Sequence, residues 1–274
     1  MLWEEGEYPE KPEFGLIDRL RGLIKGLTLV VLIFGGLFVL ILVRLVERPI
    51  YGLHRPWTPW IPQGVCAGTL KVMGIAYHAK GKRMDLHGTV VANHGSWLDI
   101  FVLNARKRAY FVSKSEVAKW PGIGWLAKAT GTVFINRNPR EAKAQQAVFE
   151  SRLLAGHKLL FFPEGTSTDG KRVLPFKPTL FQAFFSPHLE HEVYIQPVTV
   201  VYRAPEDQEP RFYGWWGEMD FAPHLWQVLC ARRQGSVTVI YHDPLKVDDF
   251  TGRKPLAAAC EAAVRAGMER EVAG

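Results

Sequence analysis

A histidine and an aspartate, with four residues between them, stand at the end of an apolar run. The run Val90–Ala92 stops at Asn93, His94 follows, and Asp99 completes the spacing. A histidine can remove a proton from a hydroxyl as a general base, and a carboxylate bonded to its ring fixes the tautomer and stabilises the cation. We therefore predict that His94 and Asp99 are the catalytic residues of a reaction at a hydroxyl group.

The residues around this pair predict a strand followed by a helix. Residues 86–92 form an apolar run typical of a buried strand, and Ser96 with Asp99 three residues later resembles an acidic helix capping box. A helix over residues 97–105 then begins directly after a tight turn, which can return the carboxylate beneath the imidazole. A capping aspartate and a buried histidine would give the same pattern without catalysis, so the prediction needs further support.

Three more segments follow in order, at residues 131–137, 161–166 and 193–200. Together with residues 90–99 they resemble the four sequence blocks of the glycerolipid acyltransferase family, whose best-known members acylate lysophosphatidic acid. The resemblance covers about residues 70 to 205. It implies transfer of a fatty acyl group from acyl carrier protein or coenzyme A to the free hydroxyl of a lysolipid, without a covalent enzyme intermediate. It implies no metal and no cofactor beyond this cosubstrate.

The loop after a predicted strand at residues 158–162 combines a carboxylate, a glycine and hydroxyl groups. A carboxylate accepts hydrogen bonds from substrate hydroxyls, and a glycine lets the backbone approach a ligand closely, although an ordinary turn has a similar composition. The resemblance implies that this loop binds the glycerol backbone. Backbone N–H groups near Gly95, or those after Glu164, are the predicted donors to the oxyanion of the tetrahedral intermediate. The predicted substrate-binding residues of the first and third blocks are Asn93, Glu164, Gly165, Thr166 and Ser167.

Arg137 and Arg140 flank the start of a predicted helix at residues 139–155. Two guanidinium groups beside a helix N-terminus can clamp a phosphate, because the helix dipole adds to their attraction. Ordinary surface charge is the alternative interpretation, and the family resemblance favours Arg137 as the phosphate ligand.

Ser167 departs from the family pattern, in which an arginine usually follows Phe-Pro-Glu-Gly-Thr. Loss of a fixed positive charge weakens the argument for a phosphate headgroup. Residues 164–170, 215–219 and 223–226 resemble members that acylate lyso-ornithine lipid. The main prediction is transfer to 1-acyl-glycerol-3-phosphate to give phosphatidic acid, and the alternative acceptor is lyso-ornithine lipid.

Two other classes of function fit parts of the sequence. A lipid esterase would need an activated nucleophile, but the sequence has no Gly-x-Ser-x-Gly, and Ser96 lies too close in sequence to His94. A non-catalytic membrane-binding protein would explain the apolar N-terminal segment but not the four ordered blocks.

Alternating strands and helices must position these residues. Their order predicts an α/β fold, a mixed sheet flanked by helices, with the site in the loops at the strand ends. Strands are expected at 86–92, 110–112, 133–135, 158–162, 193–202 and 237–241, and helices at 97–105, 115–129 with a break at Pro121-Gly122, 139–155 and 255–269.

We predict a mobile acidic tail over residues 1–13, a membrane anchor over 14–78 and a catalytic domain over 79–274. Within the anchor, residues 27–43 carry no charge, which is borderline for a bilayer core that needs about 20 helical residues. Basic side chains lie on both sides of this segment, so a spanning helix and one held in a single leaflet both fit.

An irregular connection rich in proline and tryptophan is expected over residues 51–62, followed by a second helix over 65–75. Basic charge continues beyond the anchor: seven Lys or Arg against two acids over residues 44–90, and nine against two over 100–145. Beside an apolar anchor, such charge favours an anionic membrane surface and the phosphates of an acyl carrier over nucleic acid. Three isolated cysteines form no metal-binding pattern, and we expect them to be reduced thiols that face the cytoplasm. The catalytic domain is expected at the cytoplasmic face of the inner membrane.

Overall fold

The centre of the protein is a mixed β-sheet, seen in a computed structural model that describes residues 3, 8–9, 12–136, 142–186, 189 and 193–273. Within these residues the sheet has eight strands, in the order β1-β7-β6-β2-β5-β3-β4, with β8 paired to β6. Their bounds are β1 Ala76–Lys80, β2 Gly88–Ala92, β3 Tyr110–Lys114, β4 Val133–Ile135, β5 Leu159–Phe161, β6 Tyr194–Arg203, β7 Ser236–Tyr241 and β8 Leu245–Lys246.

Strand direction brings the predicted site to one edge of the sheet. β2 is parallel to both of its neighbours, β5 and β6, while β5 is parallel to β3 and β3 to β4. Parallel strands end at the same edge, so the segments that follow β2 and β5 meet there. His94 and Glu164 lie on these two segments.

The predicted α/β class is confirmed, and each of the six expected strands overlaps an observed one. Two strands were not predicted. β1 is an edge strand whose side chains are mostly exposed, and it pairs in parallel with β7. β8 has only two residues. Neither carries the continuous apolar run that identifies a buried strand.

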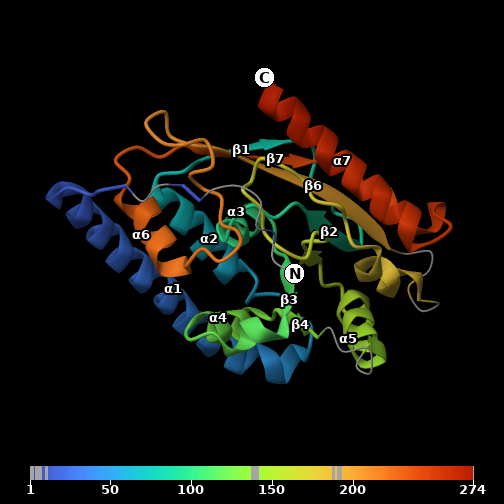
Figure 1. Cartoon of the computed structure of the whole chain (residues 1–274). Coiled ribbons are helices and arrows are strands. Elements are labelled where there is room, and N and C mark those ends of the chain that lie inside the picture. Colours follow the sequence, from blue (N-terminus) through green and yellow to red (C-terminus); the bar gives the residue numbers. More distant parts are fainter. Residues whose placement is uncertain are drawn as a thin grey trace.

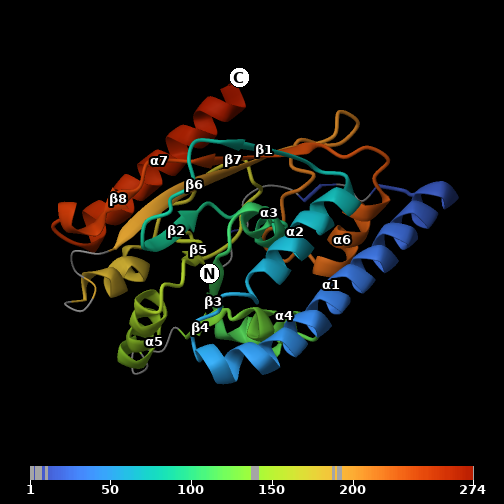
Figure 2. The same ribbon diagram turned by 180° about the vertical axis from the view of Figure 1, so that it is seen from behind.

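Helices cover both faces of the sheet (Figures 1 and 2). α1, α2, α3 and α6 lie on one side, and α7 and α5 lie on the other, with the 3-10 segment at Pro178–Phe185 between them. The α-helices are α1 Leu16–Tyr51, α2 Trp60–Met73, α3 Asp99–Arg106, α4 Ile123–Thr130, α5 Ala142–Leu154, α6 Phe221–Cys230 and α7 Arg253–Ala273, and the longer 3-10 segments are η1 Ser115–Lys119 and η3 Pro178–Phe185. α6 was not predicted from the sequence.

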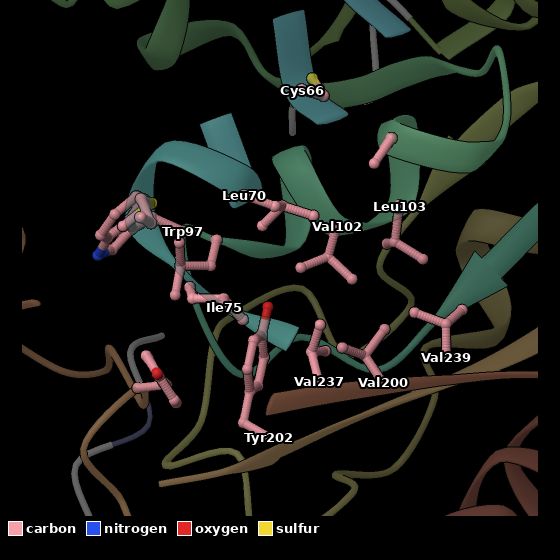
Figure 3. Packing of buried hydrophobic residues seen from close by; sticks show 14 of the residues in the cluster. Cys66, Leu70, Ile75, Trp97, Val102, Leu103, Val200, Tyr202, Val237 and Val239 are labelled. Atoms are coloured by element: carbon pink, nitrogen blue, oxygen red, sulfur yellow. The ribbon is translucent and has the colours of Figure 1, made fainter. Parts of the chain in front are cut away.

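Two hydrophobic clusters fill the spaces between the sheet and these helices. In the cluster of Figure 3, Leu70 of α2 and Val102 of α3 lie above Val200 and Val237 of β6 and β7. The second cluster packs α5, η3 and α7 against the opposite face. Successive residues of β2 alternate between the clusters, since Val90 belongs to the first and Val91 to the second. Because both faces of β2 are packed, the strand is held in one orientation, and this sets the position of His94 at its end.

α1 is long and apolar enough to cross a membrane, and 11% of its most apolar 18-residue window is buried. It contacts α2, α4 and α6 rather than standing apart from the domain. A side chain at Gly36 would overlap Val65 of α2, so the two helices are in close contact at this glycine. α1 therefore combines one face packed on the domain with an exposed apolar face.

The N-terminal region differs from the predicted boundaries in three ways. Trp3 is buried against Trp216, and Tyr8 stacks on the same ring, so these parts of the expected mobile tail are packed. The expected boundary between residues 78 and 79 falls inside β1. α2 begins at Trp60, within the segment predicted to be irregular, because Pro62 lies in the first helical turn, where proline is tolerated.

Candidate active site

His94 and Asp99 meet at the turn between β2 and α3. The distance from Nδ1 of His94 to Oδ2 of Asp99 is 2.7 Å. The same oxygen accepts the backbone N–H groups of Gly95 and Ser96 at 2.9 and 3.0 Å. Ser96 N–H binds Asp99 as the predicted capping box requires, and Ser96 Oγ accepts from Leu98 N–H at 3.2 Å. The helix, expected from residue 97, begins at Asp99 with Leu98 as its N-cap residue, so the Ser96–Asp99 pair closes the turn before α3 and does not cap it. The carboxylate therefore closes the turn and orients the imidazole at the same time.

The other carboxylate oxygen of Asp99 is bound from the sheet. The hydroxyl of Tyr202, near the end of β6, donates to Oδ1 at 2.6 Å, and both side chains are buried. Asp99 thus accepts two N–H groups and one O–H group in addition to the ring. A carboxylate surrounded by donors is an acceptor only, so Nδ1 of His94 carries the proton and Nε2 is the free base.

The imidazole of His94 is held on one face and accessible at one end. It stacks on Phe162, with ring centroids 4.0 Å apart and planes 12° apart. Its side chain is 20% exposed, whereas that of Asp99 is completely buried. Within the described part of the chain Nε2 has no hydrogen-bond partner. The geometry leaves this nitrogen free to accept a proton from a molecule outside the protein.

Glu164 supports the backbone of the histidine turn. Its Oε1 accepts His94 N–H at 2.7 Å, and its Oε2 accepts Leu174 N–H at 2.8 Å. The side chain is 1% exposed, and burial raises the pKa of Glu164 to about 8 against the opposing effect of these two donors. Because both oxygens are occupied by backbone groups, the carboxylate holds two loops together in this structure.

The loop that follows Glu164 is tied closely to the histidine turn. Thr168 N–H donates to the carbonyl of His94 at 2.9 Å. A Cβ at Gly95 would lie 2.7 Å from the Cα of Gly170, so the two backbones touch. Gly165 has φ +72°, and a Cβ there would lie 2.6 Å from Nζ of Lys177.

The ammonium group of Lys177 therefore lies against the loop predicted to bind the acceptor. Sequence reasoning missed this residue, because it lies outside the four motifs. It also missed Tyr202, which lies two residues beyond the fourth segment and 103 residues from its partner Asp99. No spacing signal along the chain could have paired them.

The other predicted substrate-binding residues have different positions. Asn93 is buried, and its amide forms two hydrogen bonds to the backbone of Val200, at 2.9 and 2.8 Å, which clamp β2 to β6. Thr166 is partly buried in the loop beside Gly165, and Ser167 is 9% exposed. Arg137 and Arg140 lie outside the described residues.

Ser96 and the three cysteines are unsuited to act as nucleophiles. Ser96 is fully buried, with its hydroxyl bonded to Leu98. The three cysteines are buried, and desolvation raises the pKa of Cys66 and of Cys260 to about 12, which disfavours the thiolate. Among the residues that the structure describes, no group of three or more His, Cys, Asp or Glu is placed to hold a metal ion.

His224, in one of the segments that resembled lyso-ornithine lipid acyltransferases, is a buried neighbour of the site. Its Nδ1 accepts from the indole N–H of Trp97 at 2.8 Å, and its Nε2 lies 3.2 Å from the carbonyl of Phe212. Desolvation lowers the pKa of His224 to about 4, so the ring is neutral and Nε2 donates to that carbonyl. This histidine joins α6 to the turn that carries His94, because Trp97 lies between His94 and the start of α3.

With this geometry, comparison with known proteins defines the class. A model of the family described as Acyltransferase matches residues 76–201, which include both His94 and Asp99. The chain is 57% identical to the lyso-ornithine lipid O-acyltransferase of Rhodobacter capsulatus, over 97% of each chain. The chain therefore belongs to the acyltransferase family.

Two further relatives bear the name of the other predicted acceptor. The 1-acyl-sn-glycerol-3-phosphate acyltransferase of Neisseria gonorrhoeae is 45% identical over 34% of this chain and 37% of its own length. The crystal structure of the 1-acyl-sn-glycerophosphate acyltransferase PlsC from Thermotoga maritima has a TM-score of 0.64, covers 94% of this chain and 98% of its own, and is 20% identical. At that identity the match to PlsC supports the fold alone.

Proposed function

We propose that the protein is a lyso-ornithine lipid O-acyltransferase, which moves a fatty acyl group from a carrier thioester to the free hydroxyl of lyso-ornithine lipid. The observation that carries this proposal is the 57% identity to an enzyme of that name over nearly the whole of both chains. The match to a 1-acyl-glycerol-3-phosphate enzyme covers about a third of each chain. The alternative acceptor of the sequence interpretation is thus better supported than its main prediction.

The mechanism begins with the pair at the β2–α3 turn. Nε2 of His94 takes the proton of the lysolipid hydroxyl as that oxygen attacks the thioester carbonyl of acyl carrier protein or acyl-coenzyme A. Asp99 holds the proton on Nδ1 and stabilises the imidazolium that forms. When the tetrahedral intermediate collapses, the carbon–sulfur bond breaks, the thiolate leaves, and His94 returns the proton to it.

The oxyanion needs hydrogen-bond donors that are not already used. Gly95 N–H, one of the predicted donors, is bonded to Asp99 and is a poor choice. The N–H groups of Thr166 and Ser167 have no acceptor among the described residues, which favours the second predicted position, after Glu164. We assign the oxyanion to these two groups.

The acceptor headgroup fits the charges beside this loop. Lyso-ornithine lipid carries a carboxylate and an ammonium group but no phosphate. Serine stands at position 167, where the family pattern has an arginine that can bind a phosphate. Lys177 places a flexible ammonium group beside Gly165. We assign the acceptor carboxylate to Lys177. Arg137 remains a predicted ligand for a phosphate acceptor.

The protein acts at a membrane in this proposal. The exposed face of α1 is apolar over most of the helix, and the helix packs along the domain through α2, α4 and α6. A helix held against the domain in this way fits insertion of its outer face into one leaflet better than independent crossing. The catalytic turn then meets lysolipid at the same surface.

Purified enzyme with a labelled acyl thioester and equal amounts of lyso-ornithine lipid and 1-acyl-glycerol-3-phosphate would test the acceptor. Acylated ornithine lipid is the expected main product, identified by mass spectrometry. Faster formation of phosphatidic acid would reverse the assignment, and release of free fatty acid would indicate an esterase.

His94→Ala should abolish transfer without loss of membrane association, whereas Asp99→Asn should be less severe because the imidazole remains. Comparable rates for wild type and a folded His94→Ala enzyme would show that His94 is not the general base.

A further inference from the structure

A hollow of about 470 Å³ lies at the other edge of the sheet from His94. The residues just before β2, β3 and β5 form part of its wall, whereas His94 and Glu164 follow the carboxyl ends of β2 and β5. These strands are parallel, and β2 has five residues, so the two sites are separated by on the order of 15 Å. The hollow is not the acyl-transfer site.

Positive charge dominates this hollow. One acidic side chain, Asp85, is among its lining residues, together with six side chains of Lys or Arg. Within the described chain, none of the six forms an ion pair with a carboxylate. The six are Arg55, Arg83, Arg106, Lys107, Arg108 and Lys158.

The contacts that hold these cations are made by neutral groups. Lys158 Nζ donates to the carbonyl of Met84 at 2.9 Å, and Lys107 Nζ lies 3.3 Å from the same carbonyl and from Oε1 of Gln196. Arg108 lies over the ring of Trp60, 4.0 Å from its centroid. Carbonyl oxygens and a ring face fix the positions of the cations but do not cancel their charge.

The pKa of Lys107 shows most clearly that burial among other cations disfavours its charged form. Lys107 is 7% exposed, and desolvation, followed by the charges of Lys158 and Arg83, lowers its pKa to about 7 against the opposing effect of Asp85. An anion in the hollow would relieve this repulsion and keep the ammonium charged. The hollow therefore has the electrostatic character of an anion-binding site.

The rim of the hollow connects it to the membrane-facing side of the protein. His54, Arg55, Pro59 and Trp60 come from the segment between α1 and the start of α2. Trp60 is 57% exposed, and Trp57 beside it is 44% exposed. Exposed tryptophans next to an apolar helix are typical of the boundary between lipid tails and headgroups.

We propose that this hollow binds the phosphate of an anionic phospholipid headgroup, at a site separate from the one that transfers the acyl group. Basic pockets beside membrane helices recognise such headgroups through paired charges and hydrogen bonds. Arg106 and Arg108, which are exposed, contact the phosphate, and the aromatic rim places the glycerol and acyl chains in the bilayer. The inference goes beyond the proposed acceptor and does not depend on it.

The test uses the full-length chain purified in an uncharged detergent. It is titrated separately with short-chain phosphatidylglycerol, short-chain phosphatidylcholine and inorganic phosphate, and the midpoint of thermal unfolding is followed. Phosphatidylglycerol should raise the midpoint saturably. Phosphatidylcholine, whose headgroup has no net charge, and inorganic phosphate, which gains nothing from the aromatic rim, should each need at least about tenfold higher concentrations.

The double variant Arg106→Gln/Arg108→Gln should weaken the phosphatidylglycerol effect about 30-fold, because two charges at the phosphate are lost. The matched control is Lys254→Gln/Arg270→Gln, which removes two exposed charges from α7 and should retain wild-type affinity. Lys158→Gln is an independent second variant if the first is unstable without lipid. Unchanged affinity in a folded pocket variant, or equal affinity for phosphatidylcholine, would overturn the proposal, and equal affinity for inorganic phosphate would overturn the lipid assignment.

Discussion

The hydroxyl of Tyr202 lies 2.6 Å from Oδ1 of Asp99, while Oδ2 of the same carboxylate lies 2.7 Å from Nδ1 of His94. The sheet therefore reaches the imidazole through a buried carboxylate. Tyr202 does not contact the ring, so it acts on His94 only by positioning Asp99 and stabilising its charge. Desolvation and the neighbouring Asp99 raise the pKa of Tyr202 well above its ordinary value, so the hydroxyl remains a donor at all working pH values.

Tyr202→Phe should lower kcat about 10- to 150-fold with little change in the Michaelis constants. The range corresponds to loss of one hydrogen bond to a charged group, roughly 1.5–3 kcal/mol. Tyr213→Phe is the matched control, because Tyr213 packs beside Tyr202 but bonds Gln234 and Gly235. Steady-state kinetics would measure kcat and the Michaelis constants of both variants. If Tyr213→Phe lowers kcat as much as Tyr202→Phe, the effect comes from packing and not from Asp99.

Glu164 predicts a pH dependence of stability. Its ordinary pKa is 4.5, and burial raises it to about 8 in the folded chain. The folded state then binds more protons than the unfolded state between these values, so this residue's contribution to stability falls as pH rises from about 4.5 to 8. Glu164→Gln should flatten this part of the profile, measured as the denaturant midpoint between pH 5 and 8.5. The same slope in both proteins would show that Glu164 does not titrate in this window.

The glycines of α1 give a test of its packing on the domain. Gly36→Ala places a methyl group against Val65 of α2, and overpacking of this kind costs about 1–3 kcal/mol. Gly35→Ala meets no atom within 4 Å and should be neutral or stabilising by up to about 1 kcal/mol, because alanine favours helix. Unfolding in detergent would measure both. Equal effects of the two substitutions would mean that α1 does not pack on α2 as described.

The sequence predicted the parts of this fold that have local patterns. The apolar runs before Asn93 and Pro163 identified β2 and β5, and the Ser96–Asp99 spacing identified the turn between β2 and α3. β1 was missed because an exposed edge strand has no apolar run. α2 begins at Trp60, five residues before the predicted start at Val65, because a proline in the first helical turn does not break a helix.

Only the contacts between residues that are close in sequence could be predicted at the site. The contact between His94 and Asp99 follows from a five-residue separation. The role of Glu164 was not foreseen, because a carboxylate in a motif gives no sign that backbone N–H groups from two loops will occupy both of its oxygens. Tyr202 and Lys177 reach the site through the tertiary fold, which brings together segments that have no periodic relation in the sequence.

Lys177 provides the sharpest test of the acceptor. If its ammonium binds the carboxylate of lyso-ornithine lipid, Lys177→Ala should raise the Michaelis constant for this acceptor about two- to fivefold, the range for a solvent-exposed ion pair, with kcat nearly unchanged. Lys177→Arg keeps the charge and should restore most of the affinity. Lyso-ornithine lipid methyl ester lacks the carboxylate, so wild type and Lys177→Ala should bind it equally. A penalty in Lys177→Ala that is just as large with the methyl ester would show that Lys177 supports the Gly165 loop without contacting the headgroup.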